Sequence, residues 1–287
     1  MAELLKGAPV AAALNEKTQE KVARLKEWGI VPTLAILRVG EREDDLSYER
    51  GAMKRCAAVG VKVKNVVLPQ DVPADRFYET LDELNYDSDV HGILMLRPLP
   101  KHIDEEKARE MLSPYKDVDG CTDLSLAGVF TNAEIGFTPC TAQAAMEILD
   151  YYHVDCAGKK AAVIGRSLVI GRPVAMLLMH KNATVTVCHT KTENLPEVAR
   201  QADILIACAG RMESVSGDYL QSGQTVIDVG IHFNEKTQKL CGDVNFAEAE
   251  PLVSAITPVP GGVGSVTTAV LVLHVAEAAE KLAYENM

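Results

Sequence analysis

Tyr48 and Lys54 are the two residues of the stretch SYERGAMKRC (residues 47–56) whose side chains could act as a catalytic pair. Side chains share one face of a helix when they are three or four positions apart, whereas these two are six apart. At about 100° per residue, this offset turns Lys54 roughly 240° from Tyr48 around the helix axis. The residue one turn after Tyr48 is Ala52, which has no acid or base. The stretch therefore predicts no working pair of this kind.

A glycine turn in VIGRSLVIGRP (residues 163–173) is a second place where chemistry is indicated. It follows an expected strand and opens an expected helix, which is where a Rossmann-type unit directs backbone N–H groups at a pyrophosphate. Gly165 and Gly171 have the spacing G-x5-G rather than G-x-G-x-x-G, so the turn could also be purely structural. Arg166 inside the turn could grip a phosphate through two hydrogen bonds.

The end of the next expected strand, VTVCHTKT (residues 185–192), indicates which dinucleotide is bound. An NAD-preferring unit usually has Asp or Glu here to bind the ribose 2'-hydroxyl. This sequence has His189, Thr190 and Lys191 instead. A hydroxyl and cations suit the 2'-phosphate of NADP, although Lys191 could equally be a solvated loop charge. The sequence favours NADP over NAD.

The composition of the 287-residue chain excludes several classes of protein. With 47% hydrophobic and 24% charged residues, the chain can bury the cores of one large domain or two. A net charge of -11 without a basic run argues against nucleic acid as a partner. Neither the seven cysteines nor the histidines have the spacing of a disulfide framework or a metal site. The N-terminus lacks the pattern of a signal peptide or membrane span, so we expect a cytoplasmic protein with no membrane partner.

The elements expected around these residues alternate between short apolar strands and helices, which is typical of parallel sheets covered by helices. The first series has strands at 33–40, 61–69 and 92–100 and helices at 45–59 and 74–85. The second runs from a helix at 141–152 to a strand at 225–233. A long amphipathic helix near the C-terminus could pack back on the first series. The expected boundary between two domains lies near TPCTA (residues 138–142).

Five motifs follow one another along almost the whole chain. They are GILMLRPLP (92–100), KDVDG (116–120), TPCTA (138–142), VIGRSLVIGRPVAMLL (163–178) and TPVPGGVGSVTTAVL (257–271). In order and spacing they resemble the motifs of the methylenetetrahydrofolate dehydrogenase/cyclohydrolase (FolD) family. The resemblance implies a two-domain α/β protein with folate in a cleft between the domains. A parallel-sheet catalytic domain would comprise residues 1–140 plus 265–287, and a Rossmann-type dinucleotide-binding domain residues 141–264.

The resemblance also implies an activity. Family members typically form homodimers and use NADP, or in some members NAD, to oxidise 5,10-methylenetetrahydrofolate to the methenyl form. Many of them then hydrolyse that product to 10-formyltetrahydrofolate. Tyr48 matches the tyrosine that lies against folate, and Asp119 matches the carboxylate that binds the pterin ring. An ionised aspartate can accept hydrogen bonds from a pterin N–H and amino group. Without the other motifs, Asp119 would be interpreted as a turn residue before Gly120.

Further positions acquire expected roles in the same way. The expected substrate-binding residues are Tyr48, Leu96, Pro98, Asp119 and Gly262. The expected cofactor-binding residues are Gly165, Arg166, Ser167, Gly171, Pro173, His189, Thr190, Lys191 and Gly264. The expected catalytic residues are Tyr48 and Asp119, with Lys54 included only in case the helix is irregular.

Two positions depart from the family's usual pattern. Ala52 stands where the family has the lysine that moves protons in the hydrolytic step, and Leu96 stands where a glutamine orients that lysine. Hydride transfer chiefly needs the two ligands held in near-attack geometry. Hydrolysis of the methenyl bridge needs proton transfer, for which a positioned group contributes roughly 10²- to 10⁴-fold. The sequence therefore predicts a dehydrogenase with weak or absent cyclohydrolase activity.

Other functions stay open at this point. A fully bifunctional enzyme would accumulate 10-formyltetrahydrofolate. A folate or nucleotide sensor without turnover would have no need of the complete PGGVG, DVDG and GRS motifs that this sequence retains. A dehydrogenase of the shikimate or amino-acid type would lack the PLP and DVDG motifs.

Overall fold

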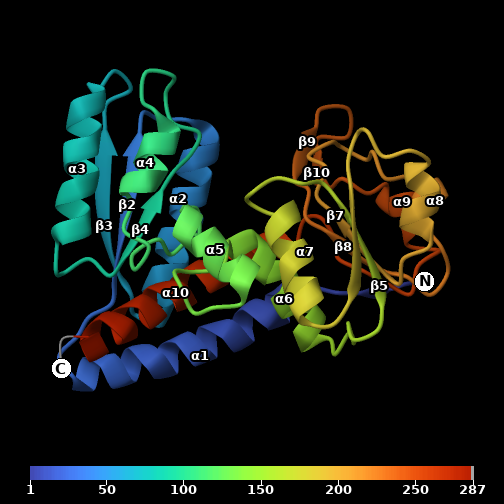
Figure 1. Ribbon diagram of the computed structural model, residues 1–287, viewed down its shortest axis with the longest axis horizontal. Coiled ribbons are helices and arrows are strands. Elements are labelled where there is room, and N and C mark those ends of the chain that lie inside the picture. The colour runs from blue at the N-terminus through green and yellow to red at the C-terminus, as the bar shows by residue number, and fades with distance from the viewer. Residues whose placement is uncertain (286–287) are drawn as a thin grey trace. The chain divides into compact units, whose positions relative to one another are not determined.

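The computed structural model describes residues 1–285, and the chain divides into two compact units (Figure 1). Unit 1 comprises residues 1–11 and 141–267, and unit 2 comprises residues 12–140 and the chain from residue 268 onward. The start of the chain belongs to unit 1 because β1 (Glu3–Leu4) pairs in parallel with β11 (Ala255–Ile256). The expected domains assigned these first residues to the other half of the protein.

Unit 2 is built on a three-stranded parallel sheet in the order β3-β2-β4. The strands are β2 (Thr33–Val39), β3 (Lys62–Leu68) and β4 (Gly92–Met95). The helices of this unit include α2 (Glu43–Val59), α3 (Ala74–Tyr86), α4 (Glu105–Met111) and α5 (Asp123–Thr131). The core packs α3 and α4 against the sheet, and every residue of the central strand β2 is buried.

Helix α2 is held at both ends and along one face. Three acidic residues in its first turn suit the positive end of the helix dipole. Gly60 ends it in the left-handed region at a φ of 81°, as a C-terminal cap commonly does. On the buried face, Glu49 accepts hydrogen bonds from Arg38 of β2 (2.6 Å) and Asn65 of β3 (3.2 Å). These contacts fix the rotation of α2 and so the direction in which Tyr48 points.

Unit 1 is built on a six-stranded parallel sheet in the order β1-β11-β8-β7-β5-β6. Its remaining strands are β5 (Lys160–Ile164), β6 (Thr184–Cys188), β7 (Ile204–Ala207) and β8 (Thr225–Asp228). Its helices are α6 (Cys140–Tyr151), most of which lies in this unit, α7 (Gly171–His180), α8 (Leu195–Arg200), α9 (Phe246–Ala249) and the 3-10 turn η1 (Gly217–Tyr219). The chain places β6 on one side of β5 and β7 on the other. In doubly wound sheets, such a reversal marks where ligands bind, outside the carboxyl ends of the strands.

Two predicted strands are wrong in extent. The strand predicted at 92–100 ends at Met95, because Pro98 and Pro100 have no N–H to continue a ladder. The strand predicted at 225–233 is instead β8 followed by β9 (His232–Asn234). β9 pairs antiparallel with β10 (Lys239–Cys241), so the chain leaves the sheet and forms a hairpin.

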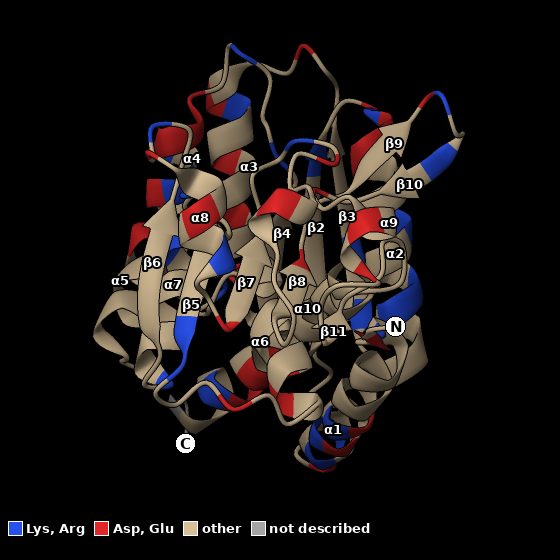
Figure 2. Cartoon of the chain, turned by 90° about the vertical axis from the view of Figure 1, so that its right-hand side faces the viewer, with Lys and Arg blue, Asp and Glu red and all other residues tan. Residues whose placement is uncertain are grey.

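Two long helices, α1 (Gly7–Glu27) and α10 (Val263–Glu285), differ in polarity. α1 carries charged side chains of both signs (Figure 2). Residues 263–284 of α10 have a window of mean hydropathy 1.3, long and apolar enough to span a membrane, but 72% of that window is buried inside the protein. This burial favours a core helix, and α10 is less amphipathic than the sequence predicted.

Candidate functional site

The DVDG turn gives its two aspartates different surroundings. Asp117 is fully buried, and its carboxylate accepts hydrogen bonds from the backbone N–H groups of Cys121 (2.9 Å) and Thr122 (2.7 Å) and from the Ser125 hydroxyl (2.7 Å). The side chain of Asp119, by contrast, keeps 24% of its surface exposed. Asp117 therefore shapes the turn, whereas Asp119 keeps surface that a ligand can reach.

Asp119 lies among groups that change its acidity. Burial raises the pKa of its carboxyl to about 6; the charge of Arg97 opposes the shift and that of Asp117 adds to it. The Arg97 guanidinium lies 3.9 Å from the Asp119 carboxylate, measured from Nη2 to Oδ2. The nearby Cys140 thiol, which donates a hydrogen bond to the Val118 carbonyl (3.2 Å), also lowers the pKa of this carboxyl. Asp119 is therefore ionised above about pH 6, and it can then accept hydrogen bonds from a ligand.

Helix α2 brings Tyr48, but not Lys54, to this carboxylate. Burial and the negative charge of Asp119 raise the pKa of the half-buried Tyr48 hydroxyl well above its usual value. Lys54 is exposed, and within residues 1–285 no hydrogen bond or ion pair joins it to either of the other two. Ala52, one turn after Tyr48, is fully buried. The structure therefore groups Tyr48 with Asp119 and leaves Lys54 in solvent.

The two other predicted substrate positions of unit 2 lie just after β4. The side chain of Leu96 is only 7% exposed, and its backbone N–H donates to Leu37 of β2 (3.0 Å). Pro98 is exposed, and its carbonyl accepts a hydrogen bond from Arg42 (3.0 Å). Of these two positions, Leu96 therefore has a largely buried apolar side chain, and Pro98 is open to solvent.

A cavity of about 410 Å³ lies in unit 1 at the carboxyl ends of β5, β6 and β7. It is lined by Ile164, Gly165, Arg166, His189, Thr190, Leu195, Ala209, Arg211, Ser214, Val215 and Tyr219. This is the place that the strand order indicates for a ligand. Two arginines and a histidine make the lining suitable for a phosphate group.

The glycine turn beside this cavity is too tight for side chains. A Cβ on Gly165 would lie 2.3 Å from the carbonyl oxygen of Cys208, and the φ of Gly165 is 133°. A Cβ on Gly171, at the start of α7, would lie 2.3 Å from the carbonyl oxygen of Gly165. Both glycines are therefore needed for the first turn of α7 to approach the end of β5. The hydroxyl of Ser167 accepts the backbone N–H of Ile170 (3.2 Å) and holds the same turn.

Most of the predicted cofactor residues lie at this cavity. Gly165, Arg166, His189 and Thr190 line it, and Ser167 and Gly171 shape its turn. The others do not line it: Pro173 is buried in α7, and Lys191 is exposed. Gly264 lines a second cavity of about 240 Å³ in unit 1, together with Gly262.

Sequence reasoning missed Arg211, a second cation at the larger cavity. Its position is fixed by Asp243, a fully buried residue that accepts the backbone N–H groups of Gly210 (2.9 Å) and Arg211 (3.0 Å). His232 lies against the same carboxylate at 2.7 Å. The available signal was that Arg211 follows a predicted strand, ADILIACAG, whose carboxyl end had to meet the glycine turn. Within residues 1–285, no group of three or more His, Cys, Asp or Glu residues could hold a metal.

Comparisons with known proteins agree with this arrangement. The catalytic domain of the tetrahydrofolate dehydrogenase/cyclohydrolase family matches residues 5–119, and the family's NAD(P)-binding domain matches residues 139–283. The bifunctional protein FolD of Carboxydothermus hydrogenoformans is 52% identical over 283 residues, which covers 98% of this chain and 99% of the relative. The FolD of Clostridioides difficile is 47% identical over 276 residues, which covers 96% of each.

Solved structures show the same likeness over the whole chain. The FolD dehydrogenase/cyclohydrolase of Campylobacter jejuni has a TM-score of 0.95 and 37% identity, covering 98% of this chain and 100% of the other. The dehydrogenase-cyclohydrolase of Trypanosoma brucei, solved with NADP and an inhibitor, has a TM-score of 0.92 and 34% identity, covering 98% of each. The two-domain α/β fold predicted from the sequence is therefore confirmed. The chain belongs to the tetrahydrofolate dehydrogenase/cyclohydrolase family.

Proposed function

We propose that this protein oxidises 5,10-methylenetetrahydrofolate to 5,10-methenyltetrahydrofolate by hydride transfer to NADP, and that its cyclohydrolase activity is weak or absent. The family's second domain binds NAD(P), and the Trypanosoma brucei relative was solved with NADP. The observation that carries the second half of the proposal is the apolar, buried Ala52 one turn after Tyr48. Position 52 offers no group that could move a proton.

The residues of unit 2 supply what the oxidation requires of the folate site. Ionised Asp119 would accept hydrogen bonds from the pterin N–H and amino groups, and the Tyr48 ring would lie against the folate. Tyr48 keeps its proton at neutral pH, since burial and the charge of Asp119 raise its pKa further above the ordinary value. Hydride transfer requires that the folate and the nicotinamide be held in near-attack geometry. It does not require an acid or base, because the nicotinamide accepts the electron pair.

The residues around the larger cavity fit NADP. Arg166, His189 and Thr190 lie at the carboxyl ends of β5 and β6, and Arg211 follows β7. Within that lining, no Asp or Glu is present to favour a free ribose 2'-hydroxyl. We propose that the guanidinium groups bind the 2'-phosphate or pyrophosphate. Lys191 would contribute only by adding positive charge nearby.

Hydrolysis of the methenyl bridge makes a different demand. Water attack and collapse of the adduct need a positioned proton carrier, which contributes roughly 10²- to 10⁴-fold. The cation nearest to Asp119 is Arg97, and a guanidinium that stays protonated is a poor base. Ala52 and Leu96 supply neither a base nor a polar partner for one, so the methenyl product would pass to a separate enzyme.

A fully bifunctional enzyme is the second candidate. The relatives at 52% and 47% identity are both named bifunctional FolD, and this favours a second activity in the present chain. Under this alternative, a group other than position 52 carries the proton. Lys54 would be the first to test, although its exposure on α2 argues against it.

We also propose that the protein forms a homodimer and resides in the cytoplasm. On the β9-β10 hairpin, Phe233 and Leu240 are paired across the strands and are 55% and 43% exposed, and Ile231 beside them is 57% exposed. An exposed apolar patch of this kind is suited to a protein interface. All seven cysteines are unpaired, as is usual in a reducing compartment.

The deciding experiment combines two assays on the purified protein. The first supplies 5,10-methylenetetrahydrofolate with NADP or NAD and follows reduced cofactor and methenyl product separately. The second adds methenyltetrahydrofolate alone and compares its decay with a buffer blank. The proposal expects NADP reduction and a decay equal to the blank. Accelerated decay would establish the bifunctional enzyme, and no cofactor reduction would refute the dehydrogenase.

The substitution Gly171→Ala is expected to weaken NADP binding by about 5- to 150-fold. The added Cβ would lie 2.3 Å from the Gly165 carbonyl oxygen, and overpacking of this kind costs roughly 1 to 3 kcal/mol. NADPH fluorescence titration measures the change in Kd. Gly51→Ala is the matched control, because the nearest atom to its Cβ is 4.0 Å away. Equal affinity of the two variants would show that the turn does not hold the cofactor.

A further inference from the structure

We propose that Arg97 is a positioning residue for the substrate, which orients the Asp119 carboxylate toward the pterin ring and balances its charge. The inference rests on the proposed dehydrogenase function, and it assigns a role to a residue for which the sequence analysis predicted none. Arg97 would act through Asp119 rather than on the reacting carbon.

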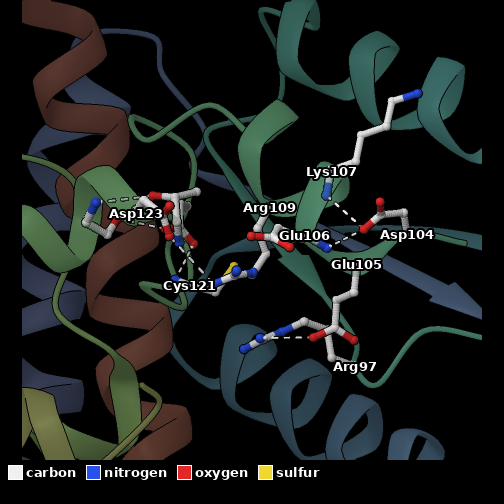
Figure 3. A network of polar contacts seen from close by, with 11 residues as sticks. Arg97, Asp104, Glu105, Glu106, Lys107, Arg109, Cys121 and Asp123 are labelled. Atoms are coloured by element: carbon white, nitrogen blue, oxygen red, sulfur yellow. Dashed lines mark hydrogen bonds and ion pairs between the residues drawn. The ribbon is translucent and has the colours of Figure 1, made fainter. Parts of the chain in front are cut away.

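The guanidinium of Arg97 is fixed between two carboxylates. Its Nη1 lies 3.5 Å from Oε1 of Glu105, and its Nη2 lies 3.9 Å from Oδ2 of Asp119. A dashed line marks the contact with Glu105 in Figure 3. The other oxygen of Glu105 accepts the backbone N–H of Leu99 (3.1 Å). Glu105 is the first residue of α4, so it ties the guanidinium to a helix and to the chain that follows β4. Arg97 is thus held in place before a ligand binds.

The direction of Arg97 follows from where β4 ends. Leu96 is still joined to β2 by a backbone hydrogen bond and is buried, whereas Arg97 is only partly buried. Successive side chains of an extended chain point to opposite sides. The apolar side chain therefore enters the core, and the cation reaches the DVDG turn.

A nearby cation keeps more of the Asp119 carboxyl in its ionised form, because it lowers the pKa of that carboxyl. Only the ionised carboxylate offers acceptors alone, because a protonated carboxyl would place an O–H donor toward the donors of the pterin. The titratable or charged groups that act on Asp119, directly or through Arg97, come from α2, α4, α6, the segment after β4 and the turn itself. They are Tyr48, Arg97, Glu105, Asp117, Cys121 and Cys140. Arg97 is the one cation among them.

The pKa of Asp119 determines in which direction pH changes folate binding. Burial raises the pKa of Asp119 to about 6 although Arg97 lowers it. Folate binding that needs the ionised form is therefore lost as the pH falls through about 6. Removing Arg97 removes the opposing charge, so the pKa of Asp119 rises and the loss begins at a higher pH.

The test is the pH profile of kcat/KM for 5,10-methylenetetrahydrofolate, with NADP saturating, in the wild-type protein and in Arg97→Leu. An opposite charge at this distance shifts a carboxyl pKa by roughly 1 to 3 units, and we expect the acid limb to move up by about 1 unit. KM for the folate should rise, whereas KM for NADP should not change. A merely structural role would lower the whole profile without moving its limb.

Three further variants make the outcome decisive. Arg97→Lys keeps the charge and should leave the acid limb closer to that of the wild type. Glu105→Gln removes the competing carboxylate, keeps an acceptor for Leu99, and should move the limb to lower pH. Arg109→Leu is the matched control, because Arg109 pairs with Asp123 (3.7 Å) rather than Asp119, and its limb should stay in place.

Failure of the inference is distinguishable from failure of the proposed function. An unmoved limb in folded Arg97→Leu, with an active wild-type enzyme, would overturn the role of Arg97 and leave the dehydrogenase intact. Equal shifts in Arg97→Leu and Arg109→Leu would also overturn it. An inactive wild-type enzyme would refute the proposed function itself.

Discussion

The double variant Ala52→Lys/Leu96→Gln is expected to hydrolyse 5,10-methenyltetrahydrofolate roughly 10²- to 10⁴-fold faster than the wild-type protein, the range contributed by a positioned proton carrier. Both positions are buried in unit 2, Ala52 fully and Leu96 with 7% of its surface exposed. Burial lowers the pKa of an amine, which would bring a lysine at position 52 closer to the range where it can exchange protons. A glutamine at position 96 would supply the polar partner that a buried ammonium needs.

Decay of the methenyl compound against a buffer blank measures this gain. The single variants Ala52→Lys and Leu96→Gln should each give less than the pair, because one has an unpartnered charge and the other has no proton carrier. Lys54→Met should leave the decay of the wild type unchanged, since Lys54 is exposed. A wild-type protein that already accelerates the decay, and loses this ability in Lys54→Met, would show that the argument from the helix face is wrong.

The parts of the fold that sequence predicts well are those governed by local pattern. β2 and β3 and the helices α2 and α3 lie within a few residues of their predicted bounds, because apolar runs and the terminal Gly60 act within single elements. The errors lie where pairing with another segment decides whether a stretch of chain joins the sheet. The strand pattern of residues 225–233 continues past Asp228, but β9 finds its partner in β10 rather than in the sheet.

The candidate site divides in the same way. Gly165 and Gly171 are predictable because a tight turn before a helix restricts the residue type locally. The place of Arg211 depends on strand order, and the ion pair of Arg97 depends on the meeting of two chain segments about twenty residues apart. A local pattern of residue types does not show which distant segments come together in the fold. The sequence therefore contained no indication of the two carboxylates that Arg97 joins.

Asp119→Asn is expected to lower kcat/KM for 5,10-methylenetetrahydrofolate by about 10²- to 10³-fold, with the NADP Kd unchanged. The amide keeps the shape of the side chain but replaces one acceptor oxygen with a donor and removes the charge. Breaking one side of a partly buried, charge-assisted recognition costs roughly 2 to 5 kcal/mol, and the expected loss corresponds to about 2.7 to 4.1 kcal/mol within that range. Initial rates over a range of folate concentrations and NADPH titration measure the two quantities.

The neighbouring Asp117→Asn is the matched control, because Asp117 accepts two backbone N–H groups and the Ser125 hydroxyl inside the same turn. The main effect of Asp117→Asn should be a lower melting temperature of the protein, whereas Asp119→Asn should leave that temperature nearly unchanged. In the Asp119→Asn background, Arg97→Leu should cost little further activity, since two residues that act through one interaction are not additive. Full additivity of the two losses would separate Arg97 from Asp119. Retention of wild-type kcat/KM in Asp119→Asn would remove this carboxylate from the substrate site altogether.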